Sequence, residues 1–233
     1  MPTVSCVMVT KGNLFPTRLA VDCFLRQTHA DRELVVVCDR EAAELKRYIA
    51  GLASPLLRFI EAAPADLGTL RNLSIAEARG ELICQWDDDD LYHPRRIEAM
   101  LEELARARAD AVFLHRWTLW WPNRATLALA GRRVWEGSML ARREVLPPYP
   151  VASRAEDSAL VRTIRESHRI KLVDDPSLYC YVFHGSNTWP EQHFRSILSR
   201  ATDVLTGEAY EARLDAMAEH MPVRDYAAGL TPA

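Results

Sequence analysis

The sequence predicts an α/β protein in which a mainly parallel sheet is flanked by helices, followed by a C-terminal helical extension. Two observations favour this class. Short apolar runs alternate with segments of helical periodicity through the first half of the chain, a pattern typical of a parallel sheet covered on both faces. Residues 190–220 then have the apolar spacing of helices.

The predicted strands are short apolar runs bounded by polar or turn-forming residues. They lie at residues 3–9, 33–38, 56–60, 81–86, 110–114 and 177–183. The helices of the first half are expected at residues 15–27, 41–52, 69–79 and 94–107. Gly80 is a natural stop for the third of these helices, and Pro94 suits the first position of the fourth.

The second half loses this regular alternation and is expected to be α+β. A helix is predicted at about residues 153–167, with Ser153 as its N-cap and Glu156 as the third residue of a capping box. The last dozen residues are expected to form a loose tail. The apolar residues of the extension are expected to pack on the domain rather than on a membrane: Phe194, Ile197, Leu198, Val204, Leu205 and Leu214.

The composition is that of a folded domain with one sizeable core. Of the 233 residues, 48% are hydrophobic and 26% are charged. The net charge of -3 gives no basic footprint, so we expect no nucleic-acid partner. No secretory signal or membrane-spanning run is recognised, which predicts a cytoplasmic protein. The five cysteines lack CxxC spacing and are expected to be buried, reduced thiols.

The stretch "QWDDDDLYHP" at residues 85–94 places four carboxylates side by side directly after an apolar run. They lie too early to cap the helix near Pro94, and their spacing is not that of a calcium loop. Two interpretations remain, a solvated loop and a site for Mg²⁺ or Mn²⁺. We favour the cation site, because ligands of open parallel sheets bind at the carboxyl ends of the strands.

Several longer segments resemble family 2 glycosyltransferases of the GT-A fold. The most specific is "LGTLRNLSIAEARGELICQWDDDDLYHPRRIEAML", which contains an Arg-Asn helix, an A-x-G-E turn, an apolar strand, a DxD motif and a P-x-R helix start in the family's order. "GSMLARREV" and "AEDSALVRTI" extend the resemblance, which covers roughly residues 3–190. It implies a GT-A-like, Rossmann-type domain over residues 1–190, with residues 191–233 as the helical extension and tail.

The resemblance also implies the chemistry and the residues of a donor site. The reaction would be an inverting transfer of a sugar from a nucleotide diphosphate to an acceptor hydroxyl, with Mn²⁺ or Mg²⁺ stabilising the leaving group. Asp157, in the "ED" pair, matches the general base. The other matched positions are Thr10, Asp39, Arg71, Asp87 and Asp88 for the nucleotide sugar, and Asp89 with His184 for the metal.

Some of these assignments have structural alternatives. Thr10, Arg71 and His184 are residue types that also serve purely structural roles, and "CDRE" at residues 38–41 departs from the family's usual two acids followed by Gly-Ser. Aromatic faces can stack on sugar rings, but we expect core packing for at least two of four tryptophans. These are Trp117, Trp120, Trp121 and Trp135.

The implied partners are a UDP-, GDP- or dTDP-sugar donor and an acceptor that is a glycan, a lipid-linked molecule or a small molecule. The sequence leaves open whether the chain forms a homo-oligomer. Two rival functions are kept. One is a catalytically idle nucleotide-sugar-binding or scaffold protein, which Asp157 argues against. The other is a metal-dependent phosphoryl or nucleotidyl transfer enzyme, which the lack of a Gly-rich phosphate loop after the first strand argues against.

Overall fold

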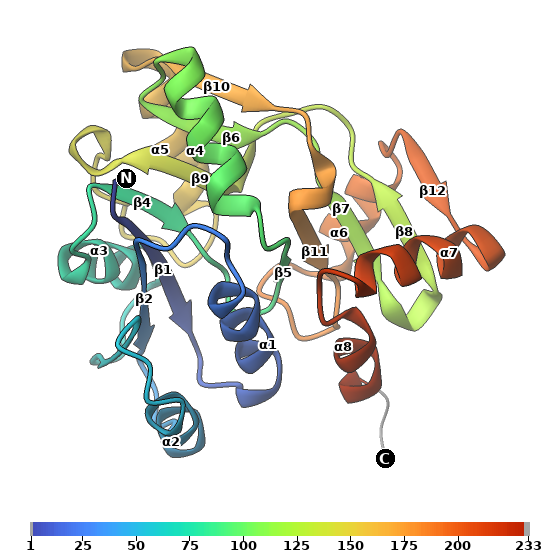
Figure 1. The fold of residues 1–233 in the computed structure, drawn as a ribbon, viewed down its shortest axis with the longest axis horizontal. Coiled ribbons are helices and arrows are strands. Elements are labelled where there is room, and N and C mark those ends of the chain that lie inside the picture. The colour runs from blue at the N-terminus through green and yellow to red at the C-terminus, as the bar shows by residue number, and fades with distance from the viewer. Residues whose placement is uncertain (1, 231–233) are drawn as a thin grey trace.

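The computed structural model describes residues 2–230, which fold around two sheets (Figure 1). Within this range one sheet has seven strands in the order β10-β6-β9-β4-β1-β2-β3. The other has five strands in the order β12-β8-β7-β11-β5. The chain passes from the first sheet to the second directly after β4, through residues 87–90, which carry the four adjacent carboxylates and are called the acidic loop below.

The larger sheet is mainly parallel, as the sequence predicts. Its strands are β1 (Val4–Thr10), β2 (Arg32–Cys38), β3 (Leu57–Glu61), β4 (Leu82–Gln85), β6 (Ala111–Leu114), β9 (Trp135–Arg142) and β10 (Ile170–Val173). Only β9 runs antiparallel to its neighbours β4 and β6. In the register of β1 and β4, Cys6 lies opposite Cys84, so the two strands end at the same edge of the sheet.

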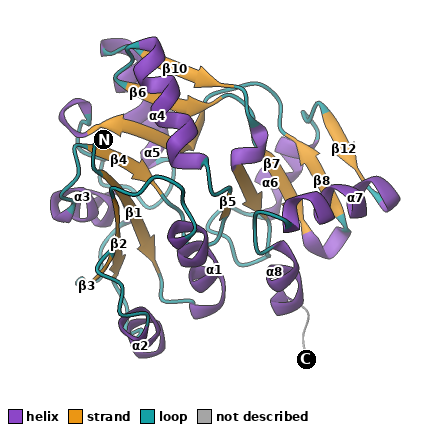
Figure 2. Cartoon of the chain, viewed as in Figure 1, coloured by secondary structure: helices purple, strands orange, loops and turns teal. Residues whose placement is uncertain are grey.

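Helices cover both faces of this sheet (Figure 2). They are α1 (Leu14–Leu25), α2 (Ala43–Gly51), α3 (Leu67–Glu77), α4 (Arg96–Ala107) and α5 (Glu156–Ser167). The side chains of β1 alternate between the faces, since Met8 packs in the cluster with α1 and Val7 packs in a separate one. Both faces are therefore apolar, which explains the continuous apolar runs of the strands.

The smaller sheet is largely a finding of the structure. Its strands are β5 (Leu91–Tyr92), β7 (Thr118–Trp121), β8 (Thr126–Leu129), β11 (Tyr179–Val182) and β12 (Asp203–Leu205). The sequence predicts only β11, because strands of two to four residues leave too short a pattern to recognise. The four tryptophans between residues 117 and 135 are all buried, in agreement with the expected core packing.

The extension packs on the rest of the chain. Its helices are α6 (Glu191–Leu198), α7 (Gly207–Ala218) and α8 (Val223–Leu230), and its strand β12 pairs with β8. Phe194 and Leu214 are buried, whereas Val204 is 47% exposed. The expected tail is wrong for residues 223–230, because α8 buries Val223 and Tyr226 against the domain. The remaining tail residues, 231–233, lie outside the described residues.

The cysteine prediction is confirmed, since all five thiols are free and buried. Of the helices in the described range, none has the length and hydropathy needed to cross a bilayer.

Candidate active site

A cavity of about 570 Å³ opens beside the carboxyl ends of β1, β2 and β4. Its volume is within the range typical of small-molecule sites. All eight residues that the sequence predicts for the site line it: Thr10, Asp39, Arg71, Asp87, Asp88, Asp89, Asp157 and His184. They come from segments up to 174 positions apart, between Thr10 and His184, so the fold brings together what the sequence only suggests.

The acidic loop is anchored at its far end by Asp90, for which the sequence suggests no role. Asp90 is only 1% exposed. Its Oδ2 accepts a hydrogen bond from Tyr179 Oη at 2.6 Å, and its Oδ1 accepts one from Val182 N at 2.9 Å. Burial, followed by the charges of Asp89 and Asp87, raises the pKa of Asp90 well above its usual range. Asp90 borders the cavity, but both of its carboxylate oxygens accept hydrogen bonds from β11, so this side chain ties the loop to that strand.

A buried guanidinium lies behind the loop. Arg96 is fully buried, and its Nη2 donates to the carbonyl of Gln85 at 2.9 Å. Its Cζ lies 4.5 Å from the ring centre of Tyr92 and 5.0 Å from those of Trp86 and Tyr179. Among residues 2–230, Arg96 Nε and Nη1 have no hydrogen-bond partner, so the faces of these rings supply the interaction.

The tyrosine hydroxyls of this aromatic cage connect it to the loop. Tyr92 Oη donates to the carbonyl of Asp87 at 2.9 Å, and Tyr179 Oη also lies 3.2 Å from Asp87 Oδ2. The rings of Tyr92 and Tyr179 both pack on Arg96. Their hydroxyls contact Asp87, so the two tyrosines connect the buried cation to the acidic loop. Trp86, Tyr92 and Arg96 lie within or just after the acidic motif, whereas Tyr179 joins them from β11, so the sequence motif does not reveal the complete support.

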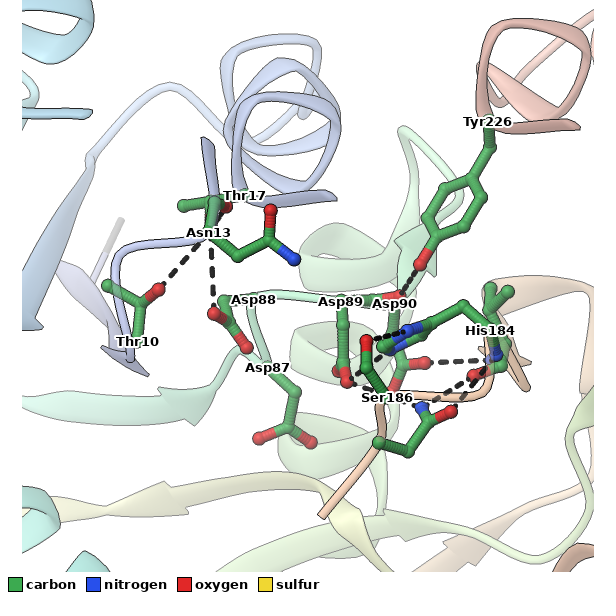
Figure 3. Close-up of polar contacts among 12 residues, drawn as sticks. Thr10, Asn13, Thr17, Asp87, Asp88, Asp89, Asp90, His184, Ser186 and Tyr226 are labelled. Atoms are coloured by element: carbon green, nitrogen blue, oxygen red, sulfur yellow. Dashed lines mark hydrogen bonds and ion pairs between the residues drawn. The ribbon is translucent and has the colours of Figure 1, made fainter. Parts of the chain in front are cut away.

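Asp88 faces the loop that follows β1 (Figure 3). Thr17 Oγ1 donates to Asp88 Oδ2 at 3.4 Å, and Thr17 Oγ1 lies 3.2 Å from Thr10 Oγ1. Burial and the charges of Asp89 and Asp87 raise the pKa of Asp88 to about 7, with hydrogen bonding to Thr10 opposing them. The carboxylates at this end of the cavity thus repel one another without an adequate positive partner.

Asp89 and His184 meet across the cavity although they are 95 positions apart. His184 Nε2 lies 3.0 Å from Asp89 Oδ2, and Asn187 Nδ2 donates to the same oxygen at 3.3 Å (Figure 3). The other ring nitrogen, Nδ1, lies 2.9 Å from Ser186 Oγ. The side chains of His184 and Asp89 are therefore oriented toward each other by hydrogen bonds to residues of the 184–187 turn.

Arg71 bridges the acidic loop and α5. Its Nε donates to Glu156 Oε1 at 2.8 Å and its Nη2 donates to Asp87 Oδ1 at 3.1 Å. Arg71 is only 7% exposed. Burial alone would lower its pKa, but the negative charges of Asp87, Glu156 and Asp157 outweigh burial and raise it. Arg71 is thus a fixed positive charge in the wall of the cavity.

The expected capping box at residues 153–156 is wrong. Helix α5 begins at Glu156, and its N-cap is Ala155, whose φ of 58° is left-handed. Ser153 consequently lies two positions before the cap and cannot bond the amides of the first turn. Glu156 is buried instead, and burial raises its pKa against the opposing effect of Arg71. Its role is that of an ion-pair partner in the cavity wall.

Asp157 follows Glu156 in the first turn of α5 and is partly exposed to the cavity. Its Oδ1 accepts a hydrogen bond from Ser158 N at 2.7 Å. Burial raises the pKa of Asp157, Arg71 opposes this increase and Asp87 adds to it. A carboxylate with a raised pKa that borders a cavity has the properties of a general base.

Thr10 and Asp39 lie at the ends of two neighbouring strands. Thr10 Oγ1 accepts a hydrogen bond from Gly12 N at 3.0 Å, which shapes the loop after β1. Asp39 directly follows β2, and its Oδ1 lies 3.9 Å from Arg40 Nε. Both side chains therefore border the same end of the cavity, opposite α5.

Tyr226 also contacts this site, which no feature of the sequence predicts. It is fully buried, and its Oη donates to the backbone carbonyl of Asp89 at 2.8 Å (Figure 3). The residue belongs to α8, which was expected to be tail. Neither a motif nor charge marks such a contact in a sequence.

Comparison with known proteins yields one family and several relatives. Residues 5–119 match the model of glycosyl transferase family 2. The curated protein WcaA of Escherichia coli (strain K12), named for glycosyl transfer in colanic acid biosynthesis, is 29% identical over 106 residues. This match covers 43% of the present chain and only 37% of the E. coli protein.

Solved structures of similar fold cover more of the chain. The mannosyltransferase PcManGT of Pyrobaculum calidifontis, in complex with GDP-Man and Mn²⁺, has a TM-score of 0.65 at 17% identity, over 98% of this chain and 68% of that one. TarS 1–349 of S. aureus has a TM-score of 0.62 at 16% identity, over 85% of this chain and 70% of that one. At these identities the likeness concerns the fold, which is the GT-A fold that the sequence predicts. Together with the family match, it shows that residues 5–119 are a glycosyl transferase family 2 region within a GT-A fold.

Proposed function

We propose that the protein is an inverting, metal-dependent glycosyltransferase that moves a sugar from a nucleotide diphosphate to an acceptor hydroxyl. One observation carries the proposal: a single cavity is lined by Asp89 and His184, by Arg71, and by Asp157. A transferase of this kind needs ligands for a cation, positive charge for a diphosphate and a base for the acceptor. The four residues supply all three.

The nucleotide would lie at the end of the cavity formed by Thr10 and Asp39. Ligands of open α/β sheets bind outside the carboxyl ends of the strands, and both residues stand at such ends. Asp39 offers carboxylate oxygens to a ribose hydroxyl or a base amino group. TarS has been solved with UDP and with UDP-GlcNAc, and PcManGT with GDP-Man. UDP-, GDP- and dTDP-sugars are therefore the donors to screen.

Asp89 and His184 would hold Mn²⁺ or Mg²⁺. The part of the chain that the structure describes contains no cluster of three or more His, Cys, Asp or Glu side chains arranged to hold an ion. Two protein ligands nevertheless suit these ions, which usually complete their octahedral shell with water and substrate phosphates. When bound, such an ion stabilises the negative charge that develops on the departing diphosphate.

Electrostatics provides an independent reason to place a cation here. Burial and the negative charges of Asp89 and Asp87 raise the pKa of Asp88, so a further positive charge beside these carboxylates would be favourable. Arg71 neutralises Asp87 only in part, because it also pairs with Glu156. A divalent ion bound at Asp89 would convert this repulsion into attraction.

Asp157 would act as the general base. It would accept the proton of the acceptor hydroxyl while that oxygen attacks the anomeric carbon from the face opposite the diphosphate. The bond between this carbon and the diphosphate oxygen breaks as the new bond forms, so the configuration inverts. The amide of Ser158 holds Asp157 Oδ1, and no donor from residues 2–230 engages Oδ2, which is the oxygen left to take the proton.

The direct test of the metal site is calorimetry with UDP and GDP, in Mn²⁺ and in chelator. We expect the preferred nucleotide to bind more tightly with Mn²⁺, because the ion neutralises charge on both the diphosphate and the loop. Asp89→Asn should reproduce the effect of the chelator. Asp203→Asn, an exposed aspartate in β12 outside the cavity, is the control and should bind like the wild type. Equal affinity in Mn²⁺ and in chelator would contradict the metal site.

A further inference from the structure

Helix α8, which lies far in sequence from residues 5–119 that match the family model, contacts the backbone of the acidic loop. Tyr226 of α8 donates a hydrogen bond from Oη to the carbonyl oxygen of Asp89, 137 positions earlier in the chain, at 2.8 Å (Figure 3). The bond is directed at the main chain, so it fixes the position of the loop rather than neutralising its charge. Asp89 is also the residue whose side chain meets His184.

Tyr226 is itself held by two other parts of the cavity frame. Its ring packs edge-on against Phe15 of α1 at 5.4 Å and against Trp120 of β7 at 5.8 Å, between ring centres. Phe15 follows the loop after β1 that lines the cavity, and Trp120 belongs to the smaller sheet. Tyr226 therefore connects three segments that approach the cavity from different directions.

Helix α8 lies close to the side chain of Phe15 in α1 at Gly229. A Cβ atom at position 229 would lie 2.0 Å from Phe15 Cε2, so Gly229 is what permits the close contact. Together with the ring contacts of Tyr226, this contact determines how α8 packs beside the acidic loop. Packing thus determines the position of the Tyr226 hydroxyl. Because the hydroxyl is fixed, its hydrogen bond can fix the position of Asp89.

We infer that Tyr226 is a positioning residue of the donor site: it fixes the Asp89 carbonyl so that the Asp89 carboxylate faces His184 in the geometry that cation binding requires. The C-terminal segment then completes the site instead of being an appendage to it. This inference rests on the proposed function for its effect on nucleotide binding. Its effect on the loop itself does not depend on that function.

The first experiment compares Tyr226→Phe with wild type in the full-length protein. Phenylalanine keeps the ring contacts and removes only the hydroxyl. Loss of one hydrogen bond of about 0.5–1.5 kcal/mol predicts that Mn²⁺-dependent affinity for UDP or GDP falls about 2- to 10-fold. Affinity in chelator should not change, because the hydroxyl acts through Asp89. A general loss of structure would lower both affinities.

Tyr210→Phe is a matched control from the same extension. Tyr210 is also buried, and its hydroxyl accepts a hydrogen bond from Trp120 Nε1 at 3.2 Å without reaching the acidic loop. We expect Tyr210→Phe to lose a buried hydrogen bond, as Tyr226→Phe does, and its melting temperature to fall by a similar amount. Its nucleotide affinity in Mn²⁺ should stay that of the wild type. An equal loss of affinity in both variants would overturn the positioning role.

Hydrogen exchange gives a second measurement that needs no nucleotide. In Tyr226→Phe, peptides covering residues 87–91 should exchange faster, while peptides covering β1 and β2 should not change. If wild type binds no nucleotide but the loop still exchanges faster in the variant, the proposed function fails and the positioning role stands. Unchanged exchange at residues 87–91 would overturn the role, as would unchanged Mn²⁺-dependent affinity in a nucleotide-binding wild type.

Discussion

Arg71 and Glu156 form a buried ion pair, with Nε and Oε1 2.8 Å apart, although 85 positions separate them in the sequence. The pair connects α3 to the first residue of α5. Because Arg71 also contacts Asp87, the acidic loop, α3 and the base-bearing helix share one electrostatic link. The placement of Asp157 in the cavity depends on this link, since Asp157 directly follows Glu156.

Glu156→Ala should therefore destabilise the fold strongly. Removing one partner of a buried pair costs up to about 3–5 kcal/mol in the free energy of unfolding, and here the guanidinium would keep only the partly exposed Asp87 as its ion-pair partner. Glu156→Gln should cost less, because the amide oxygen still accepts from Arg71. Urea denaturation measures both. The control is Glu208→Ala, an exposed acid in the first turn of α7, which should cost less than about 1 kcal/mol. Equal costs at the two glutamates would contradict the role of the pair.

Tyr179→Phe tests how the acidic loop is anchored. It leaves Asp90 Oδ2 buried without its donor, which predicts a loss of about 1–3 kcal/mol in the free energy of unfolding. Tyr149→Phe removes a buried hydroxyl that bonds only a neutral group, the side-chain amide of Gln85, at 3.1 Å. Chemical denaturation of the two variants should show the larger loss at Tyr179. The anchor would be refuted if Tyr149→Phe proved the more costly change.

The pH dependence of the reaction should reflect the environment of Asp157. Burial raises the pKa of this carboxyl, and a base is active only when ionised. Activity at saturating Mn²⁺ should therefore decline, as the pH falls, through a pKa above the ordinary aspartate value of about 3.9. The rate of donor turnover, measured between pH 4 and pH 8, gives this decline as the acidic limb of the pH–rate profile.

Arg133 allows the sign of this effect to be tested. Its charge lowers the pKa of Asp157, so Arg133→Gln should move the acidic limb to higher pH. The neighbouring Arg132, which pairs with Asp174 instead, is the matched control, and Arg132→Gln should leave the limb where it is. A limb that moves to lower pH in Arg133→Gln would exclude Asp157 as the group that titrates.

The sequence predicts the five parallel strands β1, β2, β3, β4 and β6 of the larger sheet and its helices, because each of these elements carries its own periodic signal. It does not predict β9 or β10, which lie where the regular alternation of strands and helices has ended. Strands such as β2 bury both faces and consist of consecutive apolar residues, so they stand out. Strand β12 has three residues, of which two are exposed, and it exists only because β8 offers a partner edge. Tertiary context alone determines such an element.

The site divides in the same way. Asp87, Asp89 and Asp157 are found from the sequence because adjacent acids in a fixed order are unusual and match a family pattern. Glu156 is misjudged as a capping residue because local spacing imitates a capping box, whereas a left-handed Ala155 shifts the helix start. Tyr226 is missed because its function arises from one hydrogen bond across 137 positions. No local pattern encodes a contact of that kind.

Donor turnover by Asp157→Asn is the decisive measurement for the proposed role of Asp157 as the general base of an inverting transfer. A nucleotide sugar that binds with Mn²⁺ is first selected from UDP-, GDP- and dTDP-sugars, and its slow hydrolysis is followed by NMR, which also assigns the released anomer. General-base catalysis is typically worth about 10² to 10⁴ in rate, so the variant should lose that much while its donor affinity stays within about twofold. Glu191→Gln, an exposed acid in the first turn of α6, should react like wild type. We expect an inverted product and a loss of turnover confined to Asp157→Asn; a product with retained configuration, or full turnover in that variant, would refute the general-base role of Asp157.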